Sequence, residues 1–383
     1  MAGRGYTAEG AHHAADFIAG YFSSFHLENF HHTYRQTFTL DVNVFDGKMM
    51  LVAGTDTLKP GKDFIINCAS SGGNGNLKIK NLPLKIDSQS VIPSLPKNPA
   101  GKCWVVDESV IADKQLLQFS NALQGGRMLE SSCLIELRNK IPAMDVEHSA
   151  FLPPWFVVRK DAWPADAKKI SFVADEKVLK DYPADNLIGF VPGTAQPDSF
   201  IVFTAHYDHL GQMGTATYFP GANDNASGIA MILTLAKYFS EHPQKYSVAF
   251  IAFAGEEAGL LGSQFFVKHP WIALQKIKFL TNLDIVGTGD EGIKVVNATE
   301  FKLPFDTLVS INNRKNYLKL VSPRGKAANS DHYFFSEAGV PAFFIYTMGG
   351  ISAYHDVFDR PETLPLTEFE DLFHLLIDFT GSF

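Results

Sequence analysis

The chain has 383 residues, of which 46% are hydrophobic and 19% are charged. This composition is that of an ordinary globular protein and excludes a disordered, collagen-like or disulfide-scaffold chain. The net charge of −8, without a basic stripe, argues against nucleic acid and anionic membranes as partners. Apolar runs reach only about ten residues, half of what a membrane-spanning helix needs, so we expect no membrane span.

The N-terminal half predicts a helix, a strand and then a small β-rich unit. Apolar residues recur every three or four positions over 11–25, which favours a helix, and residues 36–44 alternate as a strand. From residue 45 to 182, turns rich in glycine and proline separate short β runs. The strands expected there are 64–68, 102–106, 132–138, 155–158 and 169–174, with one helix at 114–129. Three cysteines (Cys68, Cys103 and Cys133) are too few for a disulfide framework, although one disulfide stays open.

The C-terminal half has the pattern of a layered α/β domain. Its apolar runs are nearly continuous, as in strands that are covered on both faces. An amphipathic stretch at 227–239 predicts a helix between two of them. The expected strands are 186–191, 200–204, 247–253, 279–285 and 342–346.

Histidines and carboxylates follow the ends of four of these strands, and one more carboxylate opens the helix. Because ligands of α/β sheets gather beyond the carboxyl ends of the strands, we expect these side chains to meet at one rim. The residues are His206 and Asp208, then Glu256 and Glu257, then Asp284, then His355, with Asp224 before the helix.

Imidazole and carboxylate ligands suit zinc, and two neighbouring ions usually share a bridging carboxylate and a bridging hydroxide. Two Zn²⁺ ions are balanced by one hydroxide and three carboxylates, which would be Asp224, Glu257 and Asp284. Glu256 is then left over as a carboxylate that can take a proton from metal-bound water and pass it to a leaving amine. Asp208, two residues after His206, is placed to accept the other N–H of that histidine.

Six ordered motifs resemble one known family, the co-catalytic di-zinc aminopeptidases of metallopeptidase family twenty-eight, which are relatives of bacterial leucyl aminopeptidases and glutamate carboxypeptidase. The resemblance covers about residues 186–364. The motifs are AHYDHLG, PGANDNASG, AFAGEEAGLLGS, NLDIVG, SDHYFF and YHDVFDRPETL.

The resemblance implies a ligand for each metal position. One zinc would be held by His206 and Asp284, the other by Glu257 and His355, and Asp224 would bridge the two. This family commonly has a cis peptide after the bridging aspartate, which falls here at Asp224–Asn225.

Two catalytic residues are also implied. Glu256 matches the catalytic base of the family, which acts on a metal-bridging hydroxide. Tyr354 matches a tyrosine that polarises the scissile carbonyl in some members. The expected substrate is a peptide with a free N-terminus.

The resemblance further implies a three-layer αβα sandwich around a mixed, mostly parallel sheet. Residues 1–44 and 183–383 would form this catalytic domain. Residues 45–182 would be an inserted protease-associated-like domain with few contacts across the boundary. The expected location is extracytoplasmic, periplasmic or secreted, with the signal segment absent from this chain.

Three other functions stay open. A carboxypeptidase of the same family would need basic residues for a substrate carboxylate, and Arg324 and Lys326 are the available candidates. A glutaminyl cyclase typically has Glu-Asp where this chain has Glu-Glu and binds one zinc. A receptor-like relative would have lost metal ligands. His209 and His332 are interpreted as structural or supporting residues, and Asp331 fits either role.

Overall fold

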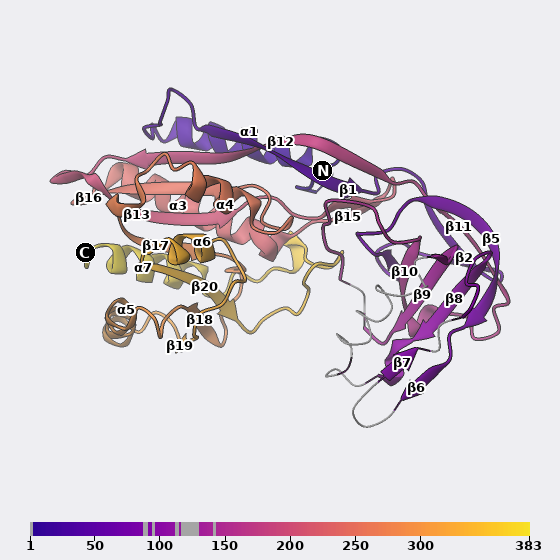
Figure 1. Cartoon of the computed structure of the whole chain (residues 1–383). Helices are drawn as coiled ribbons and strands as arrows, with labels where there is room; N and C mark the ends of the chain where they lie inside the picture. Colours follow the sequence, from indigo (N-terminus) through magenta and orange to yellow (C-terminus); the bar gives the residue numbers. More distant parts are fainter. Residues whose placement is uncertain (1–2, 87–90, 94–95, 112–114, 116–129, 141–142) are drawn as a thin grey trace.

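The computed structural model describes residues 3–383 except 87–90, 94–95, 112–114, 116–129 and 141–142. The helix expected at 114–129 therefore lies outside the described residues, apart from Gln115. Figure 1 shows two β-sheets side by side along the molecule, joined by two long strands.

The larger sheet has eight strands in the order β1-β12-β16-β13-β17-β20-β18-β19. The four central strands β16, β13, β17 and β20 are parallel. β12 pairs antiparallel with β1 and β16, and β18 pairs antiparallel with β20 but parallel with β19. The sheet is therefore mixed, and all five apolar runs expected as strands are strands in it. Its strands are β1 (Arg35–Val44), β12 (Lys177–Val191), β13 (Gln196–His206), β16 (Tyr246–Phe253), β17 (Ile277–Leu283), β18 (Gly292–Val296), β19 (Val321–Pro323) and β20 (Ala342–Met348).

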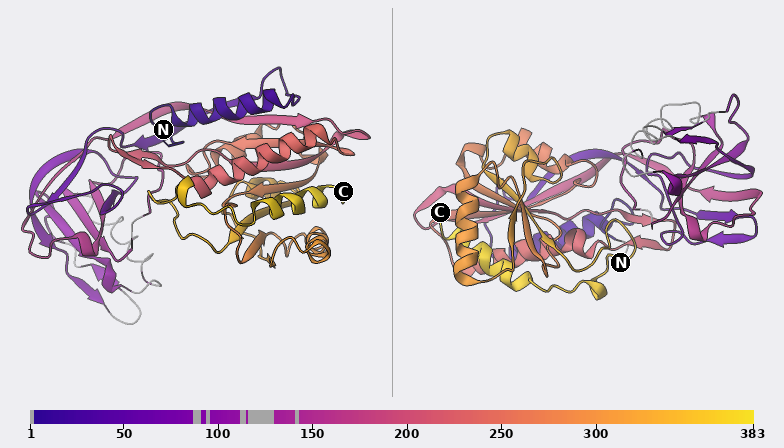
Figure 2. Two further views of the ribbon diagram at one scale, coloured as in Figure 1. Left: turned by 180° about the vertical axis from the view of Figure 1, so that it is seen from behind. Right: turned by 90° about the horizontal axis from the view of Figure 1, so that it is seen from below.

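Alternate residues of the central strands point into two separate apolar cores. On β13, Phe203 belongs to one core together with α1, α3, α5 and α7, whereas Val202 belongs to the other with α4 and α6. Helices therefore cover both faces of the larger sheet (Figure 2). The helices are α1 (Gly10–Ser24), α3 (Gly228–Glu241), α4 (Leu261–Lys268), α5 (Lys302–Lys315), α6 (His332–Glu337) and α7 (Phe369–Thr380).

The smaller sheet also has eight strands, in the order β3-β2-β11-β5-β8-β9-β10-β4, around an apolar core of its own. All five strands expected in this part of the chain are present. The strands are β2 (Met49–Ala53), β3 (Asp56–Leu58), β4 (Phe64–Ile66), β5 (Gly73–Asn81), β8 (Lys102–Asp107), β9 (Cys133–Arg138), β10 (Trp155–Arg159) and β11 (Lys169–Ala174). The described residues also include two short strand pairs: β6 (Leu84–Ile86) with β7 (Val91–Pro93), and β14 (Gly211–Met213) with β15 (Thr217–Phe219).

The connection between the two sheets differs from the sequence expectation at the start of β12. β12 begins at Lys177 and pairs there with Val44 of β1, so the boundary expected at residue 182 falls inside a strand. The start of β12 contains no apolar run that would predict a strand. It is a strand because it pairs with β1.

Side chains of the larger unit reach into the core of the smaller sheet. The core of the smaller sheet includes four residues of the larger unit: Leu210 and Val357 from loops, and Met213 and Phe219 from β14 and β15. These loops follow the strand ends that carry the candidate metal ligands. The smaller sheet is consequently packed against the site.

Candidate metal centre

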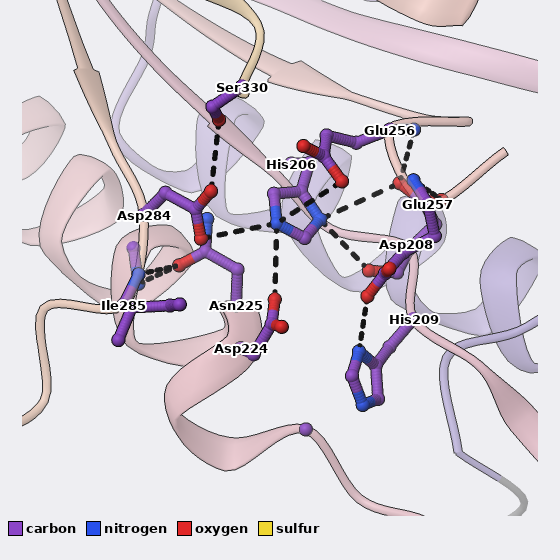
Figure 3. A network of polar contacts seen from close by, with 12 residues as sticks. His206, Asp208, His209, Asp224, Asn225, Glu256, Glu257, Asp284, Ile285 and Ser330 are labelled. Carbon is purple, nitrogen blue, oxygen red and sulfur yellow. Dashed lines mark hydrogen bonds and ion pairs between the residues drawn. The ribbon is translucent and has the colours of Figure 1, made fainter. Parts of the chain in front are cut away.

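Three adjacent parallel strands deliver the central side chains of the site. His206 is the last residue of β13, Asp284 follows β17, and Glu256 and Glu257 follow β16. Between β16 and the two glutamates, Gly255 takes a φ of +70°, a turn that favours glycine because it has no Cβ. Asp224 comes from the turn before α3 (Figure 3).

The five predicted ligands converge in two sets that share Asp224. In the first set, His206 Nε2 lies 3.3 Å from Asp224 Oδ1 and 3.3 Å from Asp284 Oδ1. In the second set, His355 Nε2 lies 3.2 Å from Asp224 Oδ2 and 3.1 Å from Glu257 Oε2. The two carboxylate oxygens of Asp224 thus face one histidine each.

These spacings fit zinc ligands. Zinc–nitrogen and zinc–oxygen bonds of about 2.0–2.1 Å in a tetrahedral arrangement place two ligand atoms about 3.3 Å apart. Among the described residues, two groups of possible ligand atoms each lie within 4.8 Å of one another. One group is His206, Asp224 and Glu257, and the other is His206, Glu256 and Asp284.

Burial and mutual repulsion dominate the electrostatics of the site. Burial raises the pKa of Glu256 well above its usual range, and the neighbouring Asp284 and Glu257 raise it further. Burial lowers the pKa of His206, but Glu256 and Asp284 outweigh this effect and raise it. Burial opposes ionisation of Asp224, yet hydrogen bonds from His206 and His355 lower its pKa well below the usual value. The buried carboxylates thus need positive charge beside them.

Asp208 does not contact His206 in the expected way. The Nδ1 atom of His206 lies 3.1 Å from the main-chain oxygen of Asp208, whereas the carboxylate is 3.8 Å away. The Asp208 carboxylate instead accepts hydrogen bonds from Tyr6 Oη and from the main-chain N–H groups of Glu256 and Glu257. These three donors occupy the carboxylate oxygens of Asp208. The imidazole of His206 therefore bonds to the main-chain carbonyl of Asp208 instead. Asp208 therefore orients the two glutamates as well as the histidine.

The side chain of Tyr354 lies at the rim of the site. It is 51% exposed, and its ring stacks on His355 with the ring centroids 4.0 Å apart.

The cis peptide expected at Asp224–Asn225 is confirmed. The Asn225 side chain holds this peptide in place. Its oxygen accepts hydrogen bonds from the N–H groups of Gly228 and Ile285, and its nitrogen donates to the Leu283 carbonyl.

The sequence reasoning missed the residues that hold the Asp224 loop. The buried guanidinium of Arg4 donates to the main-chain oxygens of Tyr207, Pro220, Gly221 and Asp224. From the other side, the Asp359 carboxylate accepts the N–H groups of Asn223 and Asp224. Asp359 lies inside the last motif and Arg4 lies near the start of the chain, but nothing in the local sequence of either indicates these distant partners.

Two further side chains orient metal-ligand candidates. His209 Nδ1 lies 2.6 Å from Glu257 Oε1, and Ser330 Oγ donates to Asp284 Oδ2 at 2.9 Å. The supporting role expected for His209 thus has a definite contact. By contrast, burial lowers the pKa of His332 to about 4, and its ring packs near Phe344, which fits a structural residue.

The basic residues considered for a substrate carboxylate are engaged elsewhere. Lys326 forms an ion pair with Glu337, and Arg324 donates to the Tyr346 hydroxyl. No helix in the described part of the chain is both long and apolar enough to cross a membrane.

The fold and the site define an α/β protein with a cluster of histidines and carboxylates suited to divalent metal. The chain belongs to peptidase family M28, whose sequence model matches residues 186–380. It is 31% identical over 170 residues to aminopeptidase YwaD of Bacillus subtilis, covering 43% of this chain and 36% of that protein. It is 33% identical over 139 residues to a probable zinc metalloprotease of Pyrenophora tritici-repentis, covering 32% and 31%. The matched segment thus spans about a third of the length of these relatives.

Solved structures match over nearly the whole chain. The zinc aminopeptidase BSAP of Bacillus subtilis superposes with a TM-score of 0.73 at 19% identity, covering 99% of this chain and 90% of that one. A peptidase M28 precursor from Shewanella amazonensis gives 0.71 at 17% identity, covering 100% and 90%. At these identities the likeness establishes a shared fold, which is a mixed α/β fold.

Proposed function

We propose that the protein is a zinc-dependent aminopeptidase that removes N-terminal residues from peptides. The observation that carries this proposal is the position of Asp224, whose two oxygens face two histidines at zinc-ligand spacing. Family membership supports peptide hydrolysis, and relatives in the family are named aminopeptidase or zinc metalloprotease.

Two zinc ions fit the donor set. His206, Asp224 and Asp284 would hold one ion, and Asp224, Glu257 and His355 the other. Three ligand carboxylates, each at most about one-tenth exposed at the side chain, provide the negative charge that two buried dications require. When bound, the zinc ions would supply Lewis acidity, which activates water at neutral pH and polarises the scissile carbonyl.

Glu256 acts as the general base and then the general acid. Its main-chain N–H donates to Asp208, which fixes the turn, and its carboxylate lies on the His206 side, with Oε2 4.0 Å from His206 Nε2. A carboxylate in this position can take a proton from the attacking water and return it to the leaving amine. Tyr354 would donate its hydroxyl to the substrate carbonyl oxygen, and its stacking on His355 at the rim of the site supports this role.

The architecture belongs to the same proposal. We assign residues 1–44 and the C-terminal half to a three-layer αβα catalytic domain, and the smaller sheet to an inserted protease-associated-like domain that ends near residue 176. The separate core of the smaller sheet and the start of β12 at Lys177 support this division. An extracytoplasmic location remains part of the proposal and rests on the family resemblance.

The test compares substrates that differ at one terminus. A zinc-loaded preparation should hydrolyse aminoacyl-4-nitroanilides and short peptides with a free α-amine, and should spare their N-acetylated twins. Cleavage that proceeds from the C-terminus, with the N-acetylated peptide still accepted, would indicate a carboxypeptidase instead. Cyclisation of N-terminal glutamine without hydrolysis would indicate a glutaminyl cyclase.

A further inference from the structure

One segment of the smaller unit reaches directly to a candidate metal ligand of the larger unit. The main-chain N–H of Met144 donates to the carbonyl oxygen of His355 at 3.0 Å. The adjacent residue, Asp145, places its Oδ1 atom 3.2 Å from His355 Nδ1. His355 is therefore held at its backbone and at its ring by two consecutive residues about 210 positions earlier in the chain.

Both partners of this contact are anchored in the core of the smaller sheet. Met144 is buried there, and so is Val357, two residues after His355. Val357 packs so closely on the loop at Gly61 that a Cβ added there would lie 2.7 Å from its Cγ1 atom. The loop that carries His355 and the segment that carries Asp145 consequently rest on one common support.

The contact fixes which nitrogen of His355 carries the proton. A carboxylate on Nδ1 accepts that N–H, so the lone pair of Nε2 points toward Asp224 and Glu257. His206 is oriented differently, because its Nδ1 donates to the main-chain oxygen of Asp208 within the larger unit. Among the residues that the structure describes, a side chain of the smaller unit thus contacts a ligand of the second metal position and none of the first.

We infer that Asp145 is a positioning residue for His355, through which the smaller unit sets the affinity of the metal position formed by Asp224, Glu257 and His355. The inference rests on the proposed two-zinc function. It gives the smaller unit a role inside the metal centre, and it makes the two zinc affinities separable by mutation.

The test uses three variants of the full-length chain: Asp145→Ala, Asp145→Asn and, as the matched control, Glu147→Gln. Glu147 lies two residues away. Among the described contacts, its carboxylate accepts one hydrogen bond, from the N–H of the adjacent His148. Zinc binding to the metal-free proteins is followed by calorimetry and chelator competition. Melting of the metal-free proteins reports on folding, and should not change because the Asp145 side chain is 70% exposed.

We expect Asp145→Ala to keep one zinc at wild-type affinity and to bind the other about 10–100-fold more weakly. Asp145→Asn should fall between it and the wild type, since an amide oxygen still accepts the Nδ1–H bond. Glu147→Gln should match the wild type. At saturating zinc, kcat of the alanine variant should recover, and KM should stay near the wild-type value.

Unchanged zinc affinities in Asp145→Ala would overturn the inference, and so would equal weakening of both positions. A raised KM with unchanged zinc binding would also overturn it, because Asp145 would then contact the substrate. These results differ from a failure of the proposed function, in which the wild-type chain itself would bind fewer than two zinc ions.

Discussion

The adjacent residues Glu256 and Glu257 should have separable roles, and conservative substitution of each one exposes the difference. Glu256→Gln keeps the shape of the side chain and removes the proton acceptor. Its main-chain bond to Asp208 does not depend on the side chain, so the turn should persist. Loss of a general acid–base lowers rates by about 10²–10⁴-fold. Because one group serves both proton transfers here, we expect kcat to fall toward the upper end of that range, with zinc content unchanged.

Glu257→Gln should act through the metal instead. The Oε2 atom of Glu257 lies 3.1 Å from His355 Nε2, and its Oε1 atom lies 2.6 Å from His209 Nδ1. Replacing this carboxylate by an amide removes a charged ligand and the acceptor that orients His209. We expect weaker zinc binding and an activity that rises again when zinc is added.

The assay measures kcat and bound zinc for both variants on one aminoacyl-anilide substrate. Near-normal turnover in Glu256→Gln would place the proton transfer on another group. Loss of zinc from Glu256→Gln would show that Glu256 is itself a ligand, as its proximity to His206 and Asp284 allows. Either result would refute the assignment of roles.

Three further predictions concern the support of the site and the smaller sheet. Arg4→Ala should lower the free energy of unfolding by at least about 2 kcal/mol, because several buried carbonyls lose their donor. Urea unfolding measures this change. A loss below about 0.5 kcal/mol, which is the range of an ordinary surface substitution, would contradict the role of Arg4. Asp208→Asn should lower kcat about 10–100-fold by loosening the turn at Glu256, and retention of wild-type kcat would show that the turn holds without it. Burial and a hydrogen bond with Glu136 raise the pKa of Glu108 from 4.5 to about 9, so its stabilising contribution is complete below pH 4.5 and is lost as pH rises through 9. Glu108→Gln should therefore gain melting temperature relative to the wild type between pH 6 and 9, and a constant difference would contradict the shift.

The strand ends that carry the site could be predicted because their signals are local. Each apolar run that becomes β13, β16 or β17 is directly followed by its functional side chain, and parallel pairing of the strands brings the three ends together. The order of the motifs supplied the remaining ligands, Asp224 and His355. The pairing of Asp224 with both histidines follows from the fold once these segments are in place.

The residues that support the ligands were not predictable, because their partners are distant in the sequence. Arg4 reaches carbonyls more than 200 positions away, and Asp145 reaches His355 over 210 positions. From its neighbours in the sequence, an arginine near the start of a chain or an aspartate in a loop is expected to be a charged side chain in solvent. Packing within the larger unit gives Arg4 its contacts, and packing of the two units gives Asp145 its ligand-orienting contact.

The same reason explains why the sequence shows neither the start of β12 nor the larger unit's contribution to the core of the smaller sheet. The polar start of β12 gives no strand signal of its own, and pairing with β1 supplies the missing stabilisation. Leu210 and Phe219 look like ordinary loop residues of the larger unit. They are buried because the smaller sheet packs over them.

The central claim, that five side chains hold two zinc ions with Asp224 between them, is tested most directly by anomalous diffraction from zinc-loaded crystals. The account predicts two zinc peaks about 3.5–4 Å apart, both adjacent to Asp224. One peak should contact His206 and Asp284, and the other Glu257 and His355. A single peak, or a peak bound by Glu256 in place of Asp224, would contradict the account.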